Sequence, residues 1–474
     1  MAVEELALMA HLFRRAGFGA SRDVLEAYVA KGYEETVDEL LAPLDHPGFD
    51  EDIMYRHWPS FVDNGTLEDN QAQWVFRMVN DPRQLREKVA LFWHTILCVG
   101  YSKVESPPQM GMHINMFRER GMGNVKDILL RLSRDPAMVY YLDNCESHKN
   151  AVNENYGREL LELFSIGVGK DGEFNYTEDD VKACARAFTG WNLGNSVPVF
   201  PYGLVPWKFV YDPADHDDTE KTFLGKTGHW NGEDVIDIIC KQPAAARFIS
   251  RKMYDFFVAD EPAVPTWRDT EPRDMDAIKM LEKVYFDSGY EVTPMLRTLF
   301  NSEFFKAKAV RFAKVKSPAE MVAGILRMTG DYREPDPWLL EPAWQTGYMG
   351  MDLMNPPTVE GWHTGREWID GGTLVERINF AADQMGNTGL PGVQDMINRL
   401  RAFGETLTAE QFVDGCLDLV GPLEVLESTR QNLLEFAREE GELRHKSDQE
   451  RTEFDRRTGE MLQMIGATGE FQFG

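Results

Sequence analysis

The sequence predicts a mainly α-helical protein, a large multi-helix globular domain with a small β-hairpin or sheet insertion at about 195–225. Three observations support this prediction. Amphipathic segments with apolar residues three or four positions apart recur along the 474 residues, as expected for helices with one buried face. Several of them begin with a capping sequence, such as Ser317–Glu320. Residues 192–230 differ in composition, being rich in glycine, proline and aromatic residues, and there we expect strands.

The composition is that of a globular chain without a membrane span. Hydrophobic residues make up 43% and charged residues 27%, which is ordinary for soluble proteins, and no run of about 18 apolar residues exists. The formal net charge of −28 argues against binding to nucleic acid or to an anionic membrane, because both need a basic face. The charge indicates solubility or, alternatively, a cationic partner or a bound divalent metal.

The N-terminal residues and the cysteines indicate in which cellular compartment the protein is expected. The opening MAVEELALMAHLF is acidic and lacks the basic and apolar regions of an export signal. The five cysteines are odd in number and widely spaced, which argues against a disulfide framework and against a cysteine-rich zinc site. We therefore expect a cytoplasmic protein.

The first 82 residues are expected to form short helices with loops. They contain Arg14 and Arg15, directly before a glycine turn that ends at Gly19. One interpretation is a surface turn in which an arginine pairs with a carboxylate. The other makes Arg15 a substrate-binding residue that recognises an anion, because a guanidinium group matches carboxylate and phosphate.

A buried helix is expected next. Asp81 and Pro82 would cap and begin it, and it would run to about Cys98. Its residues are apolar almost all round, and His94 lies on the same face as Glu87. His94 is therefore either a core histidine with satisfied nitrogens or a proton carrier or ligand.

The most distinctive segment is 153–191, which predicts a helix, a glycine-rich turn and a second helix. Asn153 would cap the first helix. Glu154, Arg158 and Glu162 follow one another at intervals of four and would form one stripe, with Glu159 about 100° away. The stripe predicts a buried network of carboxylates and a guanidinium group.

The second helix of this segment should begin at Thr177, whose side chain would cap it. Arg186 would balance the carboxylates of the first helix, and Trp191 would help the second helix to dock. We name Arg186 and Trp191, together with Arg15, as candidate substrate-binding residues.

The insertion contains acidic residues around a histidine, at Asp212–Asp218. His216 and Asp217 could bind a divalent metal through nitrogen and oxygen. The spacing does not fit an EF-hand, and a solvated turn is the competing interpretation.

Helices are expected again from Asn231, and residues 428–462 are heavily charged and helical. Residues 331–372 are rich in loops and aromatic side chains, which fits either a cover on the core or one wall of a cleft. We predict a main helical domain over 1–372, with the insertion at about 192–230, and a helical region over 373–474 packed on it.

Taken in order, these segments resemble a bacterial family of unknown function, DUF1800. The central pattern stands at Asn153–Gly167, Tyr176–Val181 and Ala185–Trp191, and flanking segments that look like the family stand at His11–Gly19, Leu85–His94, His216–Gly225, Lys316–Glu320, Pro356–Trp362 and Ala467–Gln472. The resemblance covers nearly the whole chain and implies no particular reaction. Gene context in other members implies a protein partner of a sulfatase-like family, and many members look exported.

Two functional hypotheses follow. In the first, the buried Glu/Arg network fixes helix packing and the protein is a structural or partner-binding module. In the second, the protein is a metal-assisted or general acid–base hydrolase or oxidoreductase. Its catalytic residues would be Glu154, Arg158, Glu159, Glu162 and His94. Binding of a small molecule or glycan at the aromatic loops is a third alternative.

Overall fold

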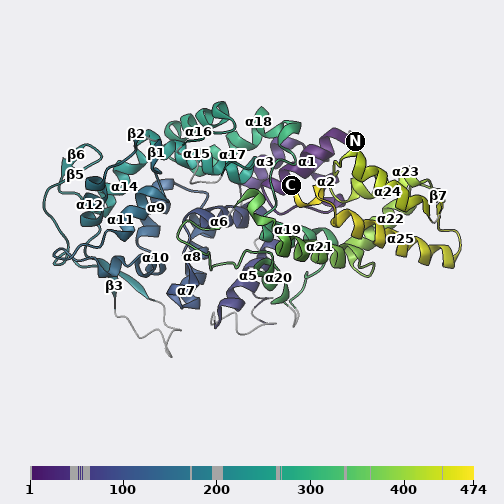
Figure 1. Ribbon diagram of the computed structural model, residues 1–474, viewed down its shortest axis with the longest axis horizontal. Helices are drawn as coiled ribbons and strands as arrows, with labels where there is room; N and C mark the ends of the chain where they lie inside the picture. The colour runs from purple at the N-terminus through teal and green to yellow at the C-terminus, as the bar shows by residue number, and fades with distance from the viewer. Residues whose placement is uncertain are drawn as a thin grey trace.

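The computed structural model describes residues 3–42, 52, 54, 56, 65–170, 173–194, 207–262, 267, 269–335, 339–362, 364–439 and 441–474. These residues are mainly helical, and their strands form small two-stranded sheets, so the predicted fold class is confirmed. The molecule is elongated, with the small hairpins at one end and the C-terminal helices at the other (Figure 1).

The N-terminal third of the chain contains α6, the helix at the centre of the molecule. Helix α6 begins at Gln84, two residues later than expected, because the Asp81 carboxylate first accepts the Arg83 amide at 2.8 Å in a turn. Its residues Leu91–Trp93 are fully buried. The helices here are α1 (Val3–Arg15), α2 (Arg22–Lys31), α3 (Tyr33–Leu41), α5 (Leu67–Asn80), α6 (Gln84–Ile96), α7 (Tyr101–Val104), α8 (Pro107–Arg120), α9 (Val125–Ser133) and α10 (Pro136–Tyr141).

The predicted helix, turn and helix of the central segment are α11 (Asn155–Glu162) and α12 (Glu178–Ala187), with a short hairpin of β1 (Gly169–Lys170) and β2 (Glu173–Phe174) between them. Thr177 and Asp180 form the expected capping box. The N-cap of α11 is Glu154, not Asn153. The Asn153 side chain instead accepts the Asn155 amide at 2.9 Å in the preceding turn.

The insertion contains two antiparallel hairpins. β3 (Trp191–Gly194) pairs with β4 (Lys208–Tyr211), and β5 (Lys221–Phe223) pairs with β6 (Lys226–Gly228). Leu224 and Gly225 both have positive φ, as the tight turn between β5 and β6 requires. The expected strand residues Val197, Val199 and Phe200 lie outside the described residues.

Of the helices after the insertion, α15–α18 lie above α6 and α19 and α20 below it in the view of Figure 1. α19 opens with the predicted capping box, in which the Glu320 carboxylate accepts the Ser317 amide at 2.7 Å. The helices are α14 (Gly232–Cys240), α15 (Pro243–Phe257), α16 (Met275–Asp287), α17 (Val292–Asn301), α18 (Glu303–Lys306), α19 (Pro318–Thr329) and α20 (Glu341–Tyr348).

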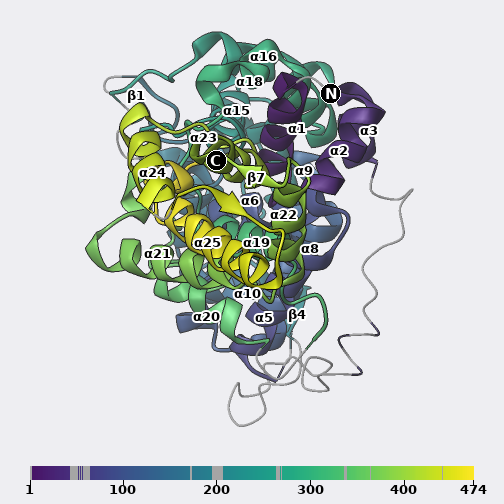
Figure 2. The same cartoon turned by 90° about the vertical axis from the view of Figure 1, so that its right-hand side faces the viewer.

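The C-terminal helices face the viewer in Figure 2, with α1–α3 beside them. The charged segment 428–462 is interrupted by a strand, because β8 pairs with β7. Glu26 of α2 pairs with Arg399 at 3.1 Å. The elements are α21 (Gly371–Gly386), α22 (Pro391–Arg401), β7 (Thr406–Leu407), α23 (Ala409–Leu419), α24 (Glu427–Glu439), β8 (Leu443–Arg444), α25 (Asp448–Gly466) and the 3₁₀ turn η6 (Glu470–Gln472). The domain boundary at residue 372 stays a prediction.

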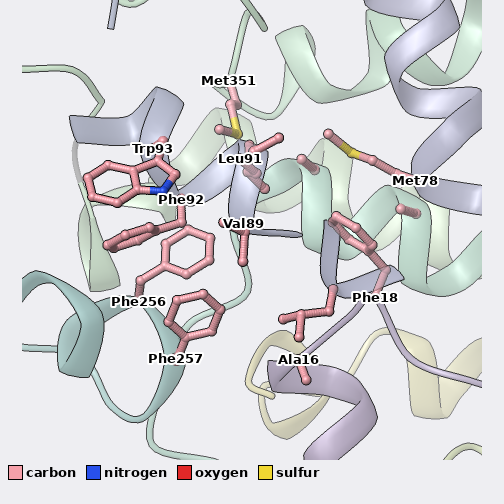
Figure 3. Close-up of a cluster of buried hydrophobic side chains, with 14 of the residues drawn as sticks. Ala16, Phe18, Met78, Val89, Leu91, Phe92, Trp93, Phe256, Phe257 and Met351 are labelled. Carbon is pink, nitrogen blue, oxygen red and sulfur yellow. The ribbon is translucent and has the colours of Figure 1, made fainter. Parts of the chain in front are cut away.

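The core is centred on α6. Phe92 packs against Phe256 and Phe257 of α15, with ring centroids 5.3 and 5.4 Å apart (Figure 3). Phe18 lies further along the same cluster. Within the described residues, none of the helices combines the length and apolar character that a membrane crossing requires.

Candidate functional site

The ion pairs of the central segment join two helices at the surface. Arg158 on α11 donates to Glu154 at 3.3 Å and to both carboxylate oxygens of Glu178 on α12 at 2.9 Å. Its side chain is 35% exposed. Glu162 instead accepts the hydroxyl of Tyr176 at 3.1 Å. The prediction of a buried stripe is therefore wrong at Arg158, because this side chain reaches across to α12.

A close approach of backbones holds α11 against α12. A Cβ atom placed on Gly157 would lie 2.9 Å from the Ala185 amide nitrogen. Glu159 follows two residues later on α11, and burial, together with the charge of Glu162, raises the pKa of its carboxyl group. The close contact between α11 and α12 is thus formed at Gly157 and Ala185.

The two predicted metal ligands are bonded to protein groups. Asp217 accepts from the Arg186 guanidinium at 2.6 Å, and His216 Nδ1 lies 2.9 Å from the Thr189 carbonyl oxygen. Arg186 and the Thr219 groups lower the pKa of Asp217 against the opposing effect of burial. In the parts of the chain that the structure describes, no group of three or more metal-ligating side chains was found. Trp191 is buried and donates to Asn231 at 2.9 Å.

His94 lies on α6 and is fully buried in the core of the molecule. Its ring faces Trp362, Trp74 and His113, with centroids 5.1, 5.5 and 5.6 Å away. Neither ring nitrogen has a hydrogen-bond partner among the described residues. The expectation of a satisfied core histidine is thus half right: His94 is buried, but its polar atoms are not satisfied. Burial lowers its pKa well below the ordinary value, so the ring is neutral.

A cleft of about 240 Å³ opens beside α6 and α15. Its lining includes Phe92 and Phe256, together with Trp362 and Trp368 from the segment that follows α20. We call this hollow the α6–α15 cleft. Trp362 and Trp368 belong to the segment for which the sequence suggested a cover or a cleft wall.

A buried ion pair lies at the inner end of the cleft. Lys88 on α6 donates to the Glu320 carboxylate at the start of α19, and both side chains are almost fully buried. Burial lowers the pKa of Lys88 to about 8. Burial would raise the pKa of Glu320, but the adjacent Lys88, Lys314 and Ser317 amide outweigh it and lower the value to about 2. Both groups are therefore charged at neutral pH.

Two further ionisable groups line the cleft from α15. Lys252 and Asp255 are three residues apart and so lie on one face of the helix. Asp255 is 8% exposed and accepts the Glu261 amide at 2.8 Å. Burial raises the pKa of Asp255 and lowers that of Lys252. Lys314, also in the lining, pairs with Asp260 at 3.3 Å.

The chain matches the family model described as "Protein of unknown function (DUF1800)" over residues 11–473. It belongs to the DUF1800 family. No curated protein and no solved structure match the chain.

Most of the flanking segments that resemble DUF1800 meet around Glu320. The cleft and a second, smaller hollow both have Glu320 in their lining. Besides Lys316–Glu320 itself, four of the segments contribute a residue to one or other hollow: Arg15 from His11–Gly19, Phe92 from Leu85–His94, Trp362 from Pro356–Trp362 and Phe471 from Ala467–Gln472. The structure thus places Arg15 and Glu320 in the lining of one hollow, whereas α11 and α12 lie near β5 and β6 at one end of the molecule (Figure 1).

Lys252 and Asp255 were not among the residues that the sequence singled out. Their segment, RFISRKMYDFF, was interpreted only as packing. A signal was present, because four charged side chains interrupt an otherwise largely apolar segment: Arg247, Arg251, Lys252 and Asp255. Buried ionisable groups are costly unless paired or functional.

Proposed function

We propose that this DUF1800 protein binds a small polar molecule in the α6–α15 cleft and performs general acid–base chemistry on it. Asp255 is the acid and Lys252 is the base. This proposal corresponds to the enzymatic hypothesis, with a different set of residues. It depends on one observation: Lys252 and Asp255, three residues apart on α15, both line the same cleft.

The pKa shifts of the two groups support these roles. A raised carboxyl pKa favours the protonated form, which can deliver a proton, and a lowered amine pKa favours the neutral form, which can accept one. Opposed shifts in neighbouring groups are typical of acid–base sites. The Glu261 amide holds the Asp255 carboxyl group in position.

The walls of the cleft suit a ligand with both apolar and polar faces. Trp362 and Trp368 offer aromatic surface and are each less than a tenth exposed. Glu320 and Lys314 are already paired, with Lys88 and Asp260. These two charges are compensated, and the exposed carboxylates of Glu360 and Glu367 also line the cleft and disfavour an anion. We therefore expect an uncharged polar molecule such as a sugar or an ester.

Two parts of the functional picture stay predictions. A protein partner of a sulfatase-like family rests on the family resemblance alone, and the cytoplasmic location rests on the N-terminal composition. The packing of α11 on α12 supports a structural role for that segment within the protein.

The test uses the full chain and neutral chromogenic substrates. Wild type, Asp255→Asn and Lys252→Met are assayed against p-nitrophenyl glycosides and carboxylic esters, with exposed Lys279→Met as the control. We expect turnover of one of the two classes and a loss of about 10²–10⁴-fold in each cleft variant, with unchanged circular dichroism. Absence of turnover with both classes, or equal turnover in all four proteins, would overturn the proposal.

A further inference from the structure

A second hollow of about 70 Å³ lies on the other side of Glu320. It is formed by the end of α1, one face of α19 and the C-terminal 3₁₀ turn η6. We call it the α1–α19 pocket. Small residues, among them Gly19, Gly324 and Gly421, line it, so the backbone surrounds much of the space.

Three cations line this pocket: Arg14, Arg15 and Lys316. Each donates to a main-chain carbonyl group. Arg14 bonds to Gly421 at 2.9 Å, Arg15 approaches Val310 at 3.4 Å, and Lys316 bonds to Phe471 at 2.7 Å. Arg15 is only 2% exposed. The Nε atoms of both arginines are buried without a hydrogen-bond partner among the described residues.

No acidic side chain of the described residues forms an ion pair with any of these three cations. Glu320, the carboxylate in the pocket lining, is already bonded to Lys88 and to the Ser317 amide. Glu424 acts on Arg14 from a distance, and its own side chain is exposed. This is unusual in a chain with 78 acidic and 50 basic residues, since buried charges are normally paired.

A fourth cation lies directly behind the pocket. Arg377 of α21 is fully buried and donates to the Lys316 carbonyl oxygen at 2.6 Å and to Gln472 at 2.9 Å. Its Nη1 atom has no hydrogen-bond partner among the described residues. Positive charge is therefore concentrated here, in a protein that is strongly acidic elsewhere.

We propose that the α1–α19 pocket binds an oxyanion, the phosphate or carboxylate group of a small molecule, between Arg14, Arg15 and Lys316. The guanidinium N–H groups match the oxygens of such an anion, and their attraction is strong where water is excluded. The volume suits one tetrahedral or planar anionic group. The site is separate from Asp255 and Lys252, so it stands independently of the acid–base proposal.

The electrostatics of the pocket agree with this assignment. Burial and mutual repulsion lower the pKa of Arg14 to about 9, and burial lowers that of Arg15 to about 10. Burial, with repulsion from Arg14 and Arg377, lowers the pKa of Lys316 to about 7. A bound anion would offset this repulsion.

The first experiment measures anion binding to the full chain by isothermal titration at constant ionic strength. Inorganic phosphate and acetate are titrated separately, to distinguish phosphate from carboxylate recognition, and chloride is the reference ion. We expect saturable binding of phosphate or acetate, at least ten-fold weaker in Arg15→Met and Lys316→Met and unchanged in Lys279→Met and Lys252→Met. Binding no stronger than that of chloride, or equal binding in all variants, would overturn the proposal.

A second measurement uses only wild-type protein and so does not depend on the folding of a variant. Trace acetylation with acetic anhydride, read by mass spectrometry, reports the reactivity of each lysine. We expect the anion that binds in the titration to slow the labelling of Lys316 at least ten-fold and to leave exposed Lys279 unchanged. Equal slowing of both lysines, or of neither, would contradict the assignment.

Discussion

Lys88 and Glu320 form a buried ion pair that lies between the α6–α15 cleft and the α1–α19 pocket. Lys88 also lies over the rings of Phe18 and Phe256, at 5.1 and 5.5 Å from their centroids. The pair therefore connects α6 to α19, beside the hydrophobic cluster in which Figure 3 labels Phe18 and Phe256.

Replacing only one partner of this pair should be strongly destabilising. Glu320→Gln would leave the Lys88 ammonium buried without a counter-charge, which costs about 3–5 kcal/mol of unfolding free energy. Urea denaturation followed by circular dichroism would measure it. Exposed Glu435→Gln is the matched control and should change little. The double variant Lys88→Met/Glu320→Leu removes both charges and should regain most of the lost unfolding free energy. If it is as unstable as Glu320→Gln, this account is wrong.

Anion binding in the α1–α19 pocket should weaken as pH rises through about 7. The Lys316 pKa is lowered to about 7, so above this pH the amine is neutral and one attractive charge is lost. Arg14, Arg15 and Arg377 keep their charge well above this range, and Glu320 stays ionised, so part of the affinity should remain. A bound anion favours the charged amine and should move the midpoint upwards.

Sulfate is the suitable probe, because it does not change charge in this range. Its dissociation constant would be measured between pH 5.5 and 8.5 for wild type and Lys316→Met. We expect weakening with pH in wild type and a flat profile in the variant. The same pH dependence in both proteins would show that another group titrates.

The contact between α11 and α12 should depend on the absence of a side chain at position 157. Gly157→Ala places a Cβ atom 2.9 Å from the Ala185 amide nitrogen, so the helices must move apart, at a cost of about 1–3 kcal/mol. Gly469→Ala is the control, since its added Cβ would meet nothing within 4 Å. Thermal unfolding of the two variants gives the comparison. Equal melting temperatures would show that α11 and α12 tolerate separation.

The helices were largely predictable from local sequence, and the site was not. Capping boxes at Thr177 and Ser317 are present as expected, because such contacts span three residues. Arg158 pairs with Glu178, which lies 20 residues away on α12. Helix periodicity predicts contacts only within one helix, so it indicated Glu162 instead. Lys88 and Glu320 are 232 residues apart, so only the folded chain shows that they meet.

The lowered pKa of His94 should make the stability of the protein depend on pH, and a variant of this residue can isolate its contribution. Its pKa is lowered well below 6.5 in the folded state, so the unfolded chain takes up a proton that the folded chain does not. Stability should therefore be fully present above pH 6.5 and fall as the pH decreases below that value. His11 is buried with a pKa shifted in the same direction, and so contributes to the same decline.

His94→Leu should remove the His94 part of this decline. Because neither nitrogen of His94 has a hydrogen-bond partner among the described residues, the replacement costs about 1 kcal/mol or less at pH 7.5. Urea unfolding between pH 5 and 7.5 should give a shallower slope for His94→Leu than for wild type, with exposed His229→Leu following wild type. An unchanged slope would mean that folded His94 accepts a proton as readily as the unfolded chain does, which requires a polar partner for its ring inside the core.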